Sequence, residues 1–419
     1  MREMKDSGIE WIGEIPATWG IIRGKYLLEY LQKPVKEDDG VITCFRDGEV
    51  TLRSNRREDG FTMSDKEIGY QGIDVGDLVV HGMDGFAGAI GISDSRGKAS
   101  PVLNVLDTRQ NKRYIMYYLR SMAYSDVFVA LTTGIRVRSC DLRWNKLADL
   151  PYPIPTPEEQ RKIVEYIDIK CAEIDALTAD IQTQIDTLEQ YKRSVITETV
   201  TKGLNPDVEM KDSGIEWIGE IPGTWDIHPV YSYFGERKNK NSLGNENNLL
   251  SLSYGRVIRK DINTNGGLLP ESFNTYNIVE ADDIIIRPTD LQNDKRSLRT
   301  GLVKEHGIIT SAYIDLCPIK HVDSRYFHYL LHAYDVMKVF YNMGNGVRQG
   351  LNYSEFSKLM LFDPSYTEQV SIANYLYKNC TEINTCIDDK QRQLEVLEEY
   401  KKSLIYEYVT GKKEVPENA

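Results

Sequence analysis

A thirteen-residue segment occurs twice in this chain and constrains its fold more than any other feature. Residues 4–16 read MKDSGIEWIGEIP, and residues 210–222 read the same. The match extends through Thr18/Thr224 and Trp19/Trp225 and is broken only at Ala17/Gly223. Identity of this length indicates an internal duplication, which has to be recognised before any other fold assignment.

A second correspondence, offset by 209 residues, shows that the duplication extends along the chain. The segment 155–167 (PTPEEQRKIVEYI) parallels 364–376 (PSYTEQVSIANYL), and 191–203 (YKRSVITETVTKG) parallels 400–412 (YKKSLIYEYVTGK). Each copy therefore has a short Trp-bearing lead, a block of roughly 135 residues and a helical tail. We predict a first globular domain at 1–155, a first helix at 156–203, a linker with the second domain at 204–363, and a second helix at 364–419.

The two tails carry a seven-residue apolar period, which indicates a coiled-coil seam. The residues of the period are Ile167, Ile174, Ile181, Leu188 and Val195 in the first tail and Leu376, Ile383, Leu397 and Leu404 in the second, interrupted at Lys390. The intervening positions are assigned to Leu177, Ile185, Tyr191, Ile387, Leu394 and Tyr400. Neither Gly nor Pro occurs in 158–201 or 367–410. Each tail therefore predicts a helix of about 44 residues, roughly 66 Å long.

The alternative to a coiled coil is that each helix packs along a globular core. Because the two copies can serve as each other's partner, we predict an antiparallel coiled coil within the chain. The lead at 4–19 should then approach the tail at 403–413.

The blocks between leads and tails predict mixed α+β domains. Short apolar runs broken by Gly and Asp at 75–93, 281–291 and 300–316 are typical of strands and turns, and each block then enters a helical stretch. The whole chain has a net charge of −12, but residues 20–150 and 223–363 are almost neutral. The overall acidity therefore does not exclude binding of these blocks to nucleic acid.

Several protein classes are excluded by simple features of the sequence. No apolar run reaches the roughly 18 residues needed to span a membrane, and the N-terminus lacks a secretory signal pattern. The six cysteines form no CxxC pair, which favours reduced, inert thiols and a cytoplasmic protein.

The order of lead, neutral block and heptad helix, repeated twice, resembles the DNA-specificity (S) subunit of Type I restriction–modification systems. The segments that carry the resemblance are 7–19 (SGIEWIGEIPATW), 133–160 (from TGIRVRS to PIPTPEEQ) and 345–369 (from NGVRQGLNY to PSYTEQ). The resemblance implies two target-recognition domains, each reading half of a split site in double-stranded DNA, separated by the paired helices. It also implies docking of two methyltransferase (M) subunits and of restriction/translocase (R) subunits, in a prokaryotic cytoplasm.

The same resemblance implies a non-catalytic chain that binds no cofactor. S-adenosylmethionine is expected in the methyltransferase partner, and ATP and Mg in the restriction partner. The chain lacks the Pro-Pro of an adenine-methyltransferase motif, and its nuclease-like Pro206–Asp207 is followed too closely by Lys211 for two strands to separate them. His328 and His332 could be two metal ligands four residues apart, but without an HExxH motif we predict ordinary surface histidines.

Residues with DNA-binding chemistry recur in both blocks. Phosphates are bound by Lys, Arg and small polar donors, whereas base edges are read by Arg, Asn and Gln. The candidates are Arg53, Arg56, Arg57, Arg136 and Arg138 in the first block, and Arg256, Arg259, Lys260, Lys295, Arg296, Arg299, Arg348, Gln349 and Asn352 in the second. We predict a DNA-binding specificity subunit, and a coiled-coil scaffold that organises proteins without touching DNA is the alternative.

Overall fold

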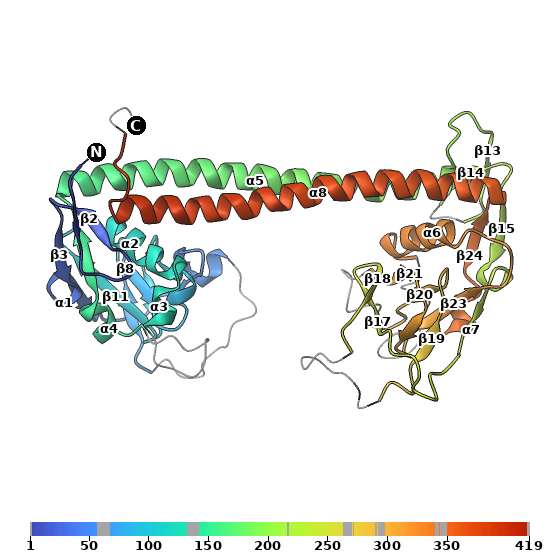
Figure 1. The fold of residues 1–419 in the computed structure, drawn as a ribbon, viewed down its shortest axis with the longest axis horizontal. Coiled ribbons are helices and arrows are strands. Elements are labelled where there is room, and N and C mark those ends of the chain that lie inside the picture. Colours follow the sequence, from blue (N-terminus) through green and yellow to red (C-terminus); the bar gives the residue numbers. More distant parts are fainter. Residues whose placement is uncertain are drawn as a thin grey trace. The chain divides into compact units, whose positions relative to one another are not determined.

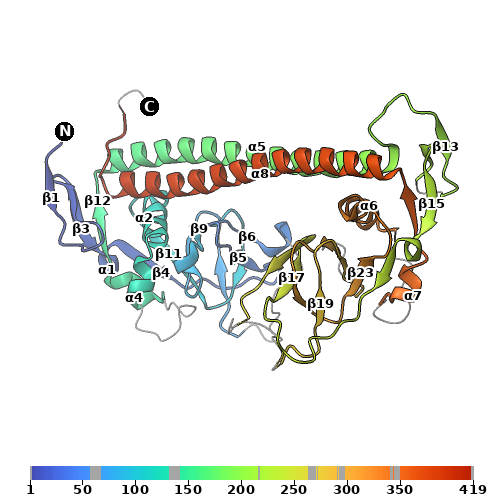
Figure 2. The same cartoon turned by 45° about the vertical axis from the view of Figure 1, so that its right-hand side comes forward.

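The computed structural model describes residues 2–56, 68–131, 142–215, 218–262, 270, 272–289, 291, 298–339, 343 and 350–416. The chain divides into two compact units. Unit 1 consists of Met1–Ile181 and Arg392–Ala419, and unit 2 of Gln182–Gln391. The two long helices thus contribute one segment each to both units (Figures 1 and 2).

Unit 1 is built on a four-stranded antiparallel sheet in the order β4-β11-β8-β9. Its strands are β4 Leu28–Leu31, β11 Leu103–Thr108, β8 Leu78–His81 and β9 Ile90–Ile92. Smaller ladders pair β1 Met4–Asp6 with β2 Glu14–Pro16, β3 Gly20–Arg23 with β12 Pro151–Ile154, β5 Ile42–Cys44 with β6 Val50–Leu52, and β7 Gln71–Ile73 with β10 Gly97–Ala99. The helices are α1 Gly24–Leu27, α2 Lys112–Tyr124, α3 Val127–Ala130, α4 Trp144–Asp149 and the first part of α5 Pro157–Lys202, with 3₁₀ turns η1 Arg53–Asn55 and η2 Gly85–Ala87.

Unit 2 repeats this plan with a sheet in the order β16-β23-β20-β21. Its strands are β16 Phe234–Glu236, β23 Ile314–Pro318, β20 Ile284–Ile286 and β21 Thr300–Leu302. The smaller ladders pair β13 Met210–Asp212 with β14 Glu220–Pro222, β15 Asp226–Pro229 with β24 Met360–Asp363, β17 Leu250–Ser253 with β18 Arg256–Arg259, and β19 Asn277–Val279 with β22 Gly307–Ile309. The helices are α6 Ser324–Val336, α7 Tyr353–Phe356 and the first part of α8 Tyr366–Val409, with the 3₁₀ turn η3 Val230–Ser232. The predicted α+β class is confirmed.

The same local signals start the equivalent helix in each unit. Asn111 caps α2 by accepting the amide of Arg113 at 3.0 Å, and Asp323 caps α6 by accepting the amide of Arg325 at 3.0 Å. Side-chain acceptors at this position satisfy amides that have no partner within the helix. Apolar and aromatic residues of both helices, such as Tyr114 and Tyr326, are fully buried in the core of their unit.

The duplicated lead forms the same hairpin in both units. Met4 lies opposite Pro16 in unit 1, and Met210 lies opposite Pro222 in unit 2. The prediction that the first lead approaches the C-terminal tail is confirmed within unit 1, because Tyr406 Oη donates to the carbonyl of Trp11 at 3.1 Å. Three further contacts join lead and tail. They are Lys412 Nζ to the Glu14 carbonyl at 2.7 Å, Arg2 to the Gly411 carbonyl at 2.8 Å, and Arg2 to the Lys413 carbonyl at 3.4 Å.

The two long helices run antiparallel within each unit, as predicted. In unit 1 the ring centroids of Tyr166 and Tyr408 lie 4.6 Å apart, and Lys401 Nζ contacts Asp175 at 2.5 Å. In unit 2 Lys390 donates to Gln184, and Lys192 Nζ donates to Asn384 at 2.8 Å. As residue numbers rise along α5 they fall along α8, which is the antiparallel arrangement. Among the described residues, no helix is long and apolar enough to cross a membrane.

The seven-residue seam is buried or half-buried throughout, but the intervening positions were partly assigned wrongly. Ile185 and Ile387 are buried and Leu394 is half-buried, whereas Leu177, Tyr191 and Tyr400 are exposed by 47%, 56% and 53%. Cys171 and Cys380 are buried instead. The intervening seam residue lies four positions after the period residue, not three. The wrong assignments arose because an apolar or aromatic side chain lies three positions after the period residue, on the adjacent, exposed face of the helix.

A buried carboxyl group distinguishes the sheet of unit 2 from that of unit 1. Asp315 on β23 is 1% exposed, and among the described residues its side-chain oxygens have no hydrogen-bond partner. Arg237 forms an ion pair with Asp283 at 2.7 Å but lies 3.9 Å from Asp315. Burial and the adjacent Asp283 charge raise the pKa of Asp315 to about 8. By strand register, the residue of unit 1 that corresponds to Asp315 is the buried Val105.

We expect Asp315→Val to stabilise the protein, and most strongly at alkaline pH. The folded-state pKa lies above the ordinary value of 3.8, so between about pH 4 and 8 the folded state holds a proton that the unfolded state has released. Wild-type stability should therefore fall as pH rises through this window. Removing the carboxylate should raise the free energy of unfolding by on the order of 3 kcal/mol at pH 8, and much less at pH 4.

Urea unfolding of the full chain at several pH values measures this effect. The matched control is Val105→Asp in unit 1, which places an acid in the equivalent buried position and should destabilise the protein. Identical pH dependence in wild type and Asp315→Val would contradict the assignment.

Candidate nucleic-acid interface

The described basic candidates of unit 2 gather on the β17–β18 hairpin. Tyr254 and Gly255 form its turn, with φ values of 46° and 76°. Positive φ at both turn residues is the backbone geometry that a tight two-residue hairpin prefers. Arg256, Arg259 and Lys260 are all exposed, and Tyr254 is 84% exposed. The hairpin therefore presents three cations and an aromatic ring to solvent, a combination suited to phosphates and bases.

Two of these cations differ in how they are held. Arg259 Nε lies 2.6 Å from Glu305 Oε1, and this contact raises the pKa of Arg259 and lowers that of Glu305. Among the described residues, the side chain of Lys260 makes no ion pair or hydrogen bond, whereas its amide donates to the carbonyl of Leu249 at 2.8 Å. Lys260, directly after β18, is thus more readily available to a phosphate than Arg259.

The described candidates of unit 1 lie around η1. Arg53 is half-buried, with Nε 3.4 Å from Thr43 Oγ1. Arg56 forms ion pairs with Asp47 at 2.7 Å and with Glu49 at 3.2 Å, and its guanidinium lies 4.2 Å from the centre of the Phe45 ring. Arg56 is therefore oriented by protein contacts, and contact with DNA would have to compete with two carboxylates.

One candidate is corrected by the structure. Arg299 is fully buried, its guanidinium donates to the carbonyl of Thr289, and its backbone amide donates to the carboxylate of Asp335 on α6. A buried arginine held inside the fold cannot reach a DNA groove, so Arg299 has a structural role. Asn352 is exposed and caps α7, its side chain accepting the amide of Glu355 at 3.0 Å. DNA contact by Asn352 stays a prediction. Seven further candidates lie outside the described residues: Arg57, Arg136, Arg138, Lys295, Arg296, Arg348 and Gln349.

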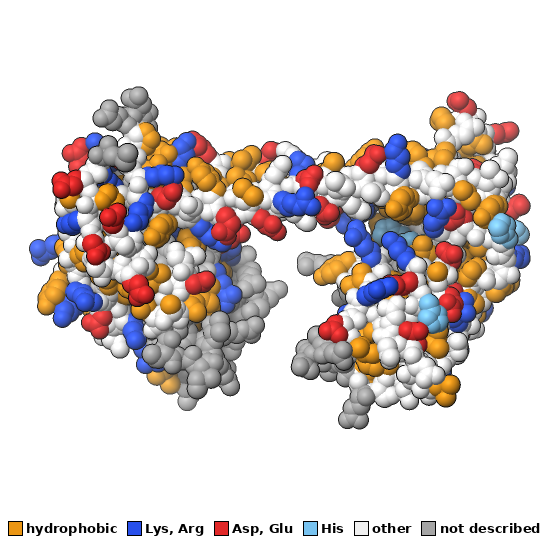
Figure 3. Space-filling view, viewed as in Figure 1, with side chains coloured by type: hydrophobic (Ala, Val, Ile, Leu, Met, Phe, Trp, Pro, Cys, Tyr) orange, Lys and Arg blue, Asp and Glu red, His pale blue; other side chains and the backbone are white. Residues whose placement is uncertain are grey.

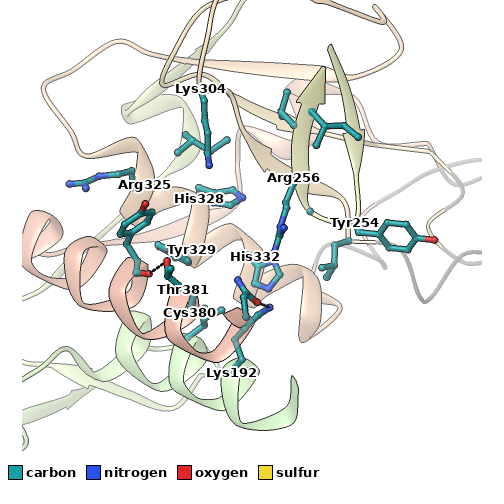
Figure 4. Close-up of a pocket in the computed structure, with 18 of the residues that line it drawn as sticks. Lys192, Tyr254, Arg256, Lys304, Arg325, His328, Tyr329, His332, Cys380 and Thr381 are labelled. Carbon is teal, nitrogen blue, oxygen red and sulfur yellow. Dashed lines mark hydrogen bonds between the residues drawn. The ribbon is translucent and has the colours of Figure 1, made fainter. Parts of the chain in front are cut away.

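A pocket of about 870 Å³ in unit 2 contains residues that the sequence reasoning missed. Arg256 lines it together with Lys192, Lys304, Arg325, His328 and His332 (Figure 4). The prediction that the two histidines are ordinary surface residues is wrong, because both are half-buried on α6 and face this pocket. Burial lowers the pKa of His328 to about 4 and that of His332 to about 3. Both rings are therefore neutral near pH 7. Among the described residues, no group of three His, Cys, Asp or Glu side chains could hold a metal ion.

Comparisons with known proteins agree with the duplicated architecture. No protein-family model matches the chain. A type I restriction enzyme MjaX specificity subunit from Methanocaldococcus jannaschii is 24% identical over an alignment 425 positions long, which covers 96% of this chain and 95% of that protein. A chain in a solved structure that concerns complex assembly and conformational transition of the type I R-M system matches with a TM-score of 0.70 and 11% identity, covering 95% of this chain and 99% of that chain.

A third comparison, with the crystal structure of the HsdS subunit from Thermoanaerobacter tengcongensis, gives a TM-score of 0.49 and 12% identity, covering 95% of this chain and 98% of that chain. The solved structure with the TM-score of 0.70 shares the fold. The relative from Methanocaldococcus jannaschii matches along nearly its whole length. With its repeated leads, paired helices and two α+β units, the chain is thus similar along nearly its whole length to a specificity subunit of a type I restriction enzyme, and it shares its fold with a chain from a type I R-M system.

Proposed function

We propose that this chain is the non-catalytic subunit that reads a bipartite DNA target and directs the methyltransferase and restriction subunits of a Type I complex. The observation that carries the proposal is a duplication in which the fold of the two units is the same, whereas the sequences of the exposed hairpins differ. The leads, sheets and helices of the two units correspond strand by strand, whereas the β5–β6 and β17–β18 hairpins differ in sequence and charge. Two equivalent frames that present different side chains are suited to reading two different half-sites.

The helices support the docking of two methyltransferase subunits. Tyr191 and Tyr400 occupy equivalent positions, offset by 209 residues, and are exposed by 56% and 53%. Ile169 on α5 and Val396 on α8 are also exposed, by 55% and 67%. The 209-residue offset places Lys378 and Thr187 where Ile169 and Val396 would be repeated, so the exposed tyrosine is the member of this set that recurs in both copies. Exposed aromatic side chains are typical of a protein interface. Two equivalent tyrosine positions would accept two copies of one partner.

DNA binding by the complex of this chain with its methyltransferase tests the proposal. We expect specific binding of one duplex sequence, with an affinity that falls steeply as salt rises, because phosphate contacts release counterions. The restriction subunit should join the same complex. A complex that assembles with its protein partners but binds duplex DNA without sequence preference would favour the scaffold alternative.

Lys260→Ala should weaken DNA binding by the complex about equally for cognate and unrelated sequences. Removing one phosphate contact should reduce the slope of log affinity against log salt by about 0.9. The exposed Lys211 on β13 provides a control of the same charge, and Lys211→Ala should leave the slope unchanged. Equal slopes for wild type and Lys260→Ala would remove Lys260 from the interface.

A further inference from the structure

The pocket of unit 2 lies between the β17–β18 hairpin, β21 and the helices α5, α6 and α8. In Figure 4, Arg256 and Lys304 extend from the strand side toward His332 and His328 on α6, and Lys192 rises from α5. In the space-filling view, Lys, Arg and His side chains gather in a hollow beneath the helices of unit 2 (Figure 3). Its volume of about 870 Å³ is within the range of sites that bind small ligands.

Strand register gives the residue of unit 1 that corresponds to each strand residue of the pocket. In unit 1 Cys44 lies opposite Val50, and in unit 2 Leu252 lies opposite Val257, so that Arg256 corresponds to Glu49. Leu78 lies opposite Ile92 and Ile284 lies opposite Leu302, so that Lys304 corresponds to Asp94. The 209-residue offset relates Tyr377 to Asp168 and Asn384 to Asp175.

Four acids of unit 1 are therefore replaced in the pocket of unit 2. Two become cations, Arg256 and Lys304, and two become the neutral residues Tyr377 and Asn384. Three positions change in the opposite sense, since Asp282 and Asp388 line the pocket where unit 1 has Gly76 and Ala179, and neutral His332 stands where unit 1 has Arg120. The exchange is still dominated by loss of negative charge.

Two of these unit 1 carboxylates form ion pairs with basic residues, and the equivalent basic residues are present in unit 2. Asp175 pairs with Lys401 at 2.5 Å, and the lysine equivalent to Lys401 is Lys192, which contacts only the neutral amide of Asn384 among the described residues. Asp168 pairs with Arg113 at 2.6 Å, and the equivalent Arg325 contacts Asp323 and Asn374 instead. Lys192 and Arg325 of the pocket are thus basic in both units, whereas the carboxylates that pair with their equivalents in unit 1 are absent from unit 2.

Unit 1 closes the corresponding space with a side chain. Arg120 on α2 donates to the carbonyl of Asp47 in the β5–β6 turn at 2.7 Å. The helix alignment of 113–124 with 325–336 relates Arg120 to His332 and the buried Met116 to His328. In unit 2 the shorter histidine leaves the space between helix and hairpin open.

The pocket also holds polar groups whose hydrogen bonds are not satisfied. His328 Nε2 is buried without a hydrogen-bond partner among the described residues. Arg256 and Lys304 form no ion pair with any of the described residues. The charges of Arg256 and Arg193 add to burial in lowering the pKa of Lys192, and the charges of Lys192 and Arg193 do the same for His332. Grouped cations without carboxylate partners are expected to be satisfied by an anion.

We infer that this pocket binds a phosphate group, and that the phosphate belongs to the backbone of DNA held by unit 2. The inference rests on the proposed function. Arg256 on β18 and Lys304 in the segment after β21 supply the charge. The DNA backbone is favoured over a free nucleotide because Arg256 shares its strand with the exposed Arg259, and the exposed Lys260 follows directly, so the pocket continues a basic surface.

The test replaces the two cations with the acids that unit 1 carries, in the variant Arg256→Glu/Lys304→Asp. DNA binding is measured by the complex with its methyltransferase over a range of salt concentrations. We expect the affinity to fall at least about tenfold near 0.1 M salt, and the salt slope to fall by about two contacts, with the recognised sequence unchanged. The control Lys211→Glu makes an equal charge reversal on β13.

Calorimetry of the DNA-free complex with pyrophosphate and with ATP distinguishes the two sources of phosphate. Pyrophosphate or ATP binding that the double variant abolishes, together with unchanged DNA affinity, would overturn the DNA source. A folded double variant that matches Lys211→Glu in DNA binding and salt slope would overturn the pocket inference alone, provided that the wild-type complex binds specific DNA. A wild-type complex without specific DNA binding would overturn the proposed function as well.

Discussion

Replacing residues 223–363 with the corresponding segment of another specificity subunit should change one half of the recognised DNA sequence and leave the other half intact. The structure makes this exchange feasible because the segment begins and ends in one ladder. Strand β15 pairs with β24, with Asp226 opposite Asp363, so both junctions lie at the same edge of the unit. The hybrid should keep a tryptophan at position 225, near the start of the exchanged segment. Trp225 is fully buried and packs in the core of unit 2 with residues of α5 and α8.

The expected effect on recognition is large. Affinity for the original site should fall by several powers of ten, toward the non-specific level, while the hybrid half-site is bound and methylated. Sequencing of the methylated sites in a host that carries the hybrid complex measures the result. The reciprocal exchange at 20–154, between the equivalent β3 and β12, should change the other half-site. If both halves change in either hybrid, the units do not read DNA independently.

Lengthening both helices by one turn should lengthen the spacer between the half-sites by one or two base pairs. Four residues add about 6 Å to an α-helix, and base pairs are spaced by about 3.4 Å. The insertions belong next to Gln184 in α5 and Lys390 in α8, because these residues contact each other across the antiparallel pair. A matched insertion preserves the pairing of α5 residues with α8 residues on either side of the added turn. Both half-sites should stay unchanged.

A paired insertion of seven residues provides the control for this prediction. It preserves the heptad pattern and adds about 10.5 Å, which corresponds to roughly three base pairs. If the helices only tie the units together, the variants should lose stability without a change of spacer. An active, folded complex that methylates sites of the original spacing would therefore exclude a role of the helices as a ruler.

Local patterns in the sequence were sufficient to define the framework of this protein. The lead of residues 4–16 and its repeat predicted the duplication, and the absence of Gly and Pro predicted two helices whose observed lengths are 46 and 44 residues. Gly203 and Gly411 end these helices with φ values of 74° and 73°, a conformation that glycine adopts without strain. Helix length, helix ends and strand alternation depend on neighbouring residues, and a sequence displays these neighbours directly.

The tertiary structure alone decided which basic residues are available to a ligand. Arg256 and Arg299 look alike in the sequence, yet one lines a pocket and the other is fully buried beneath α6. His328 and His332 face a pocket whose cations come from β18, from the segment after β21 and from α5, up to 140 positions away in the chain. Burial and the pairing of charges depend on contacts between residues far apart in sequence. Spacing along the chain carries no record of such contacts.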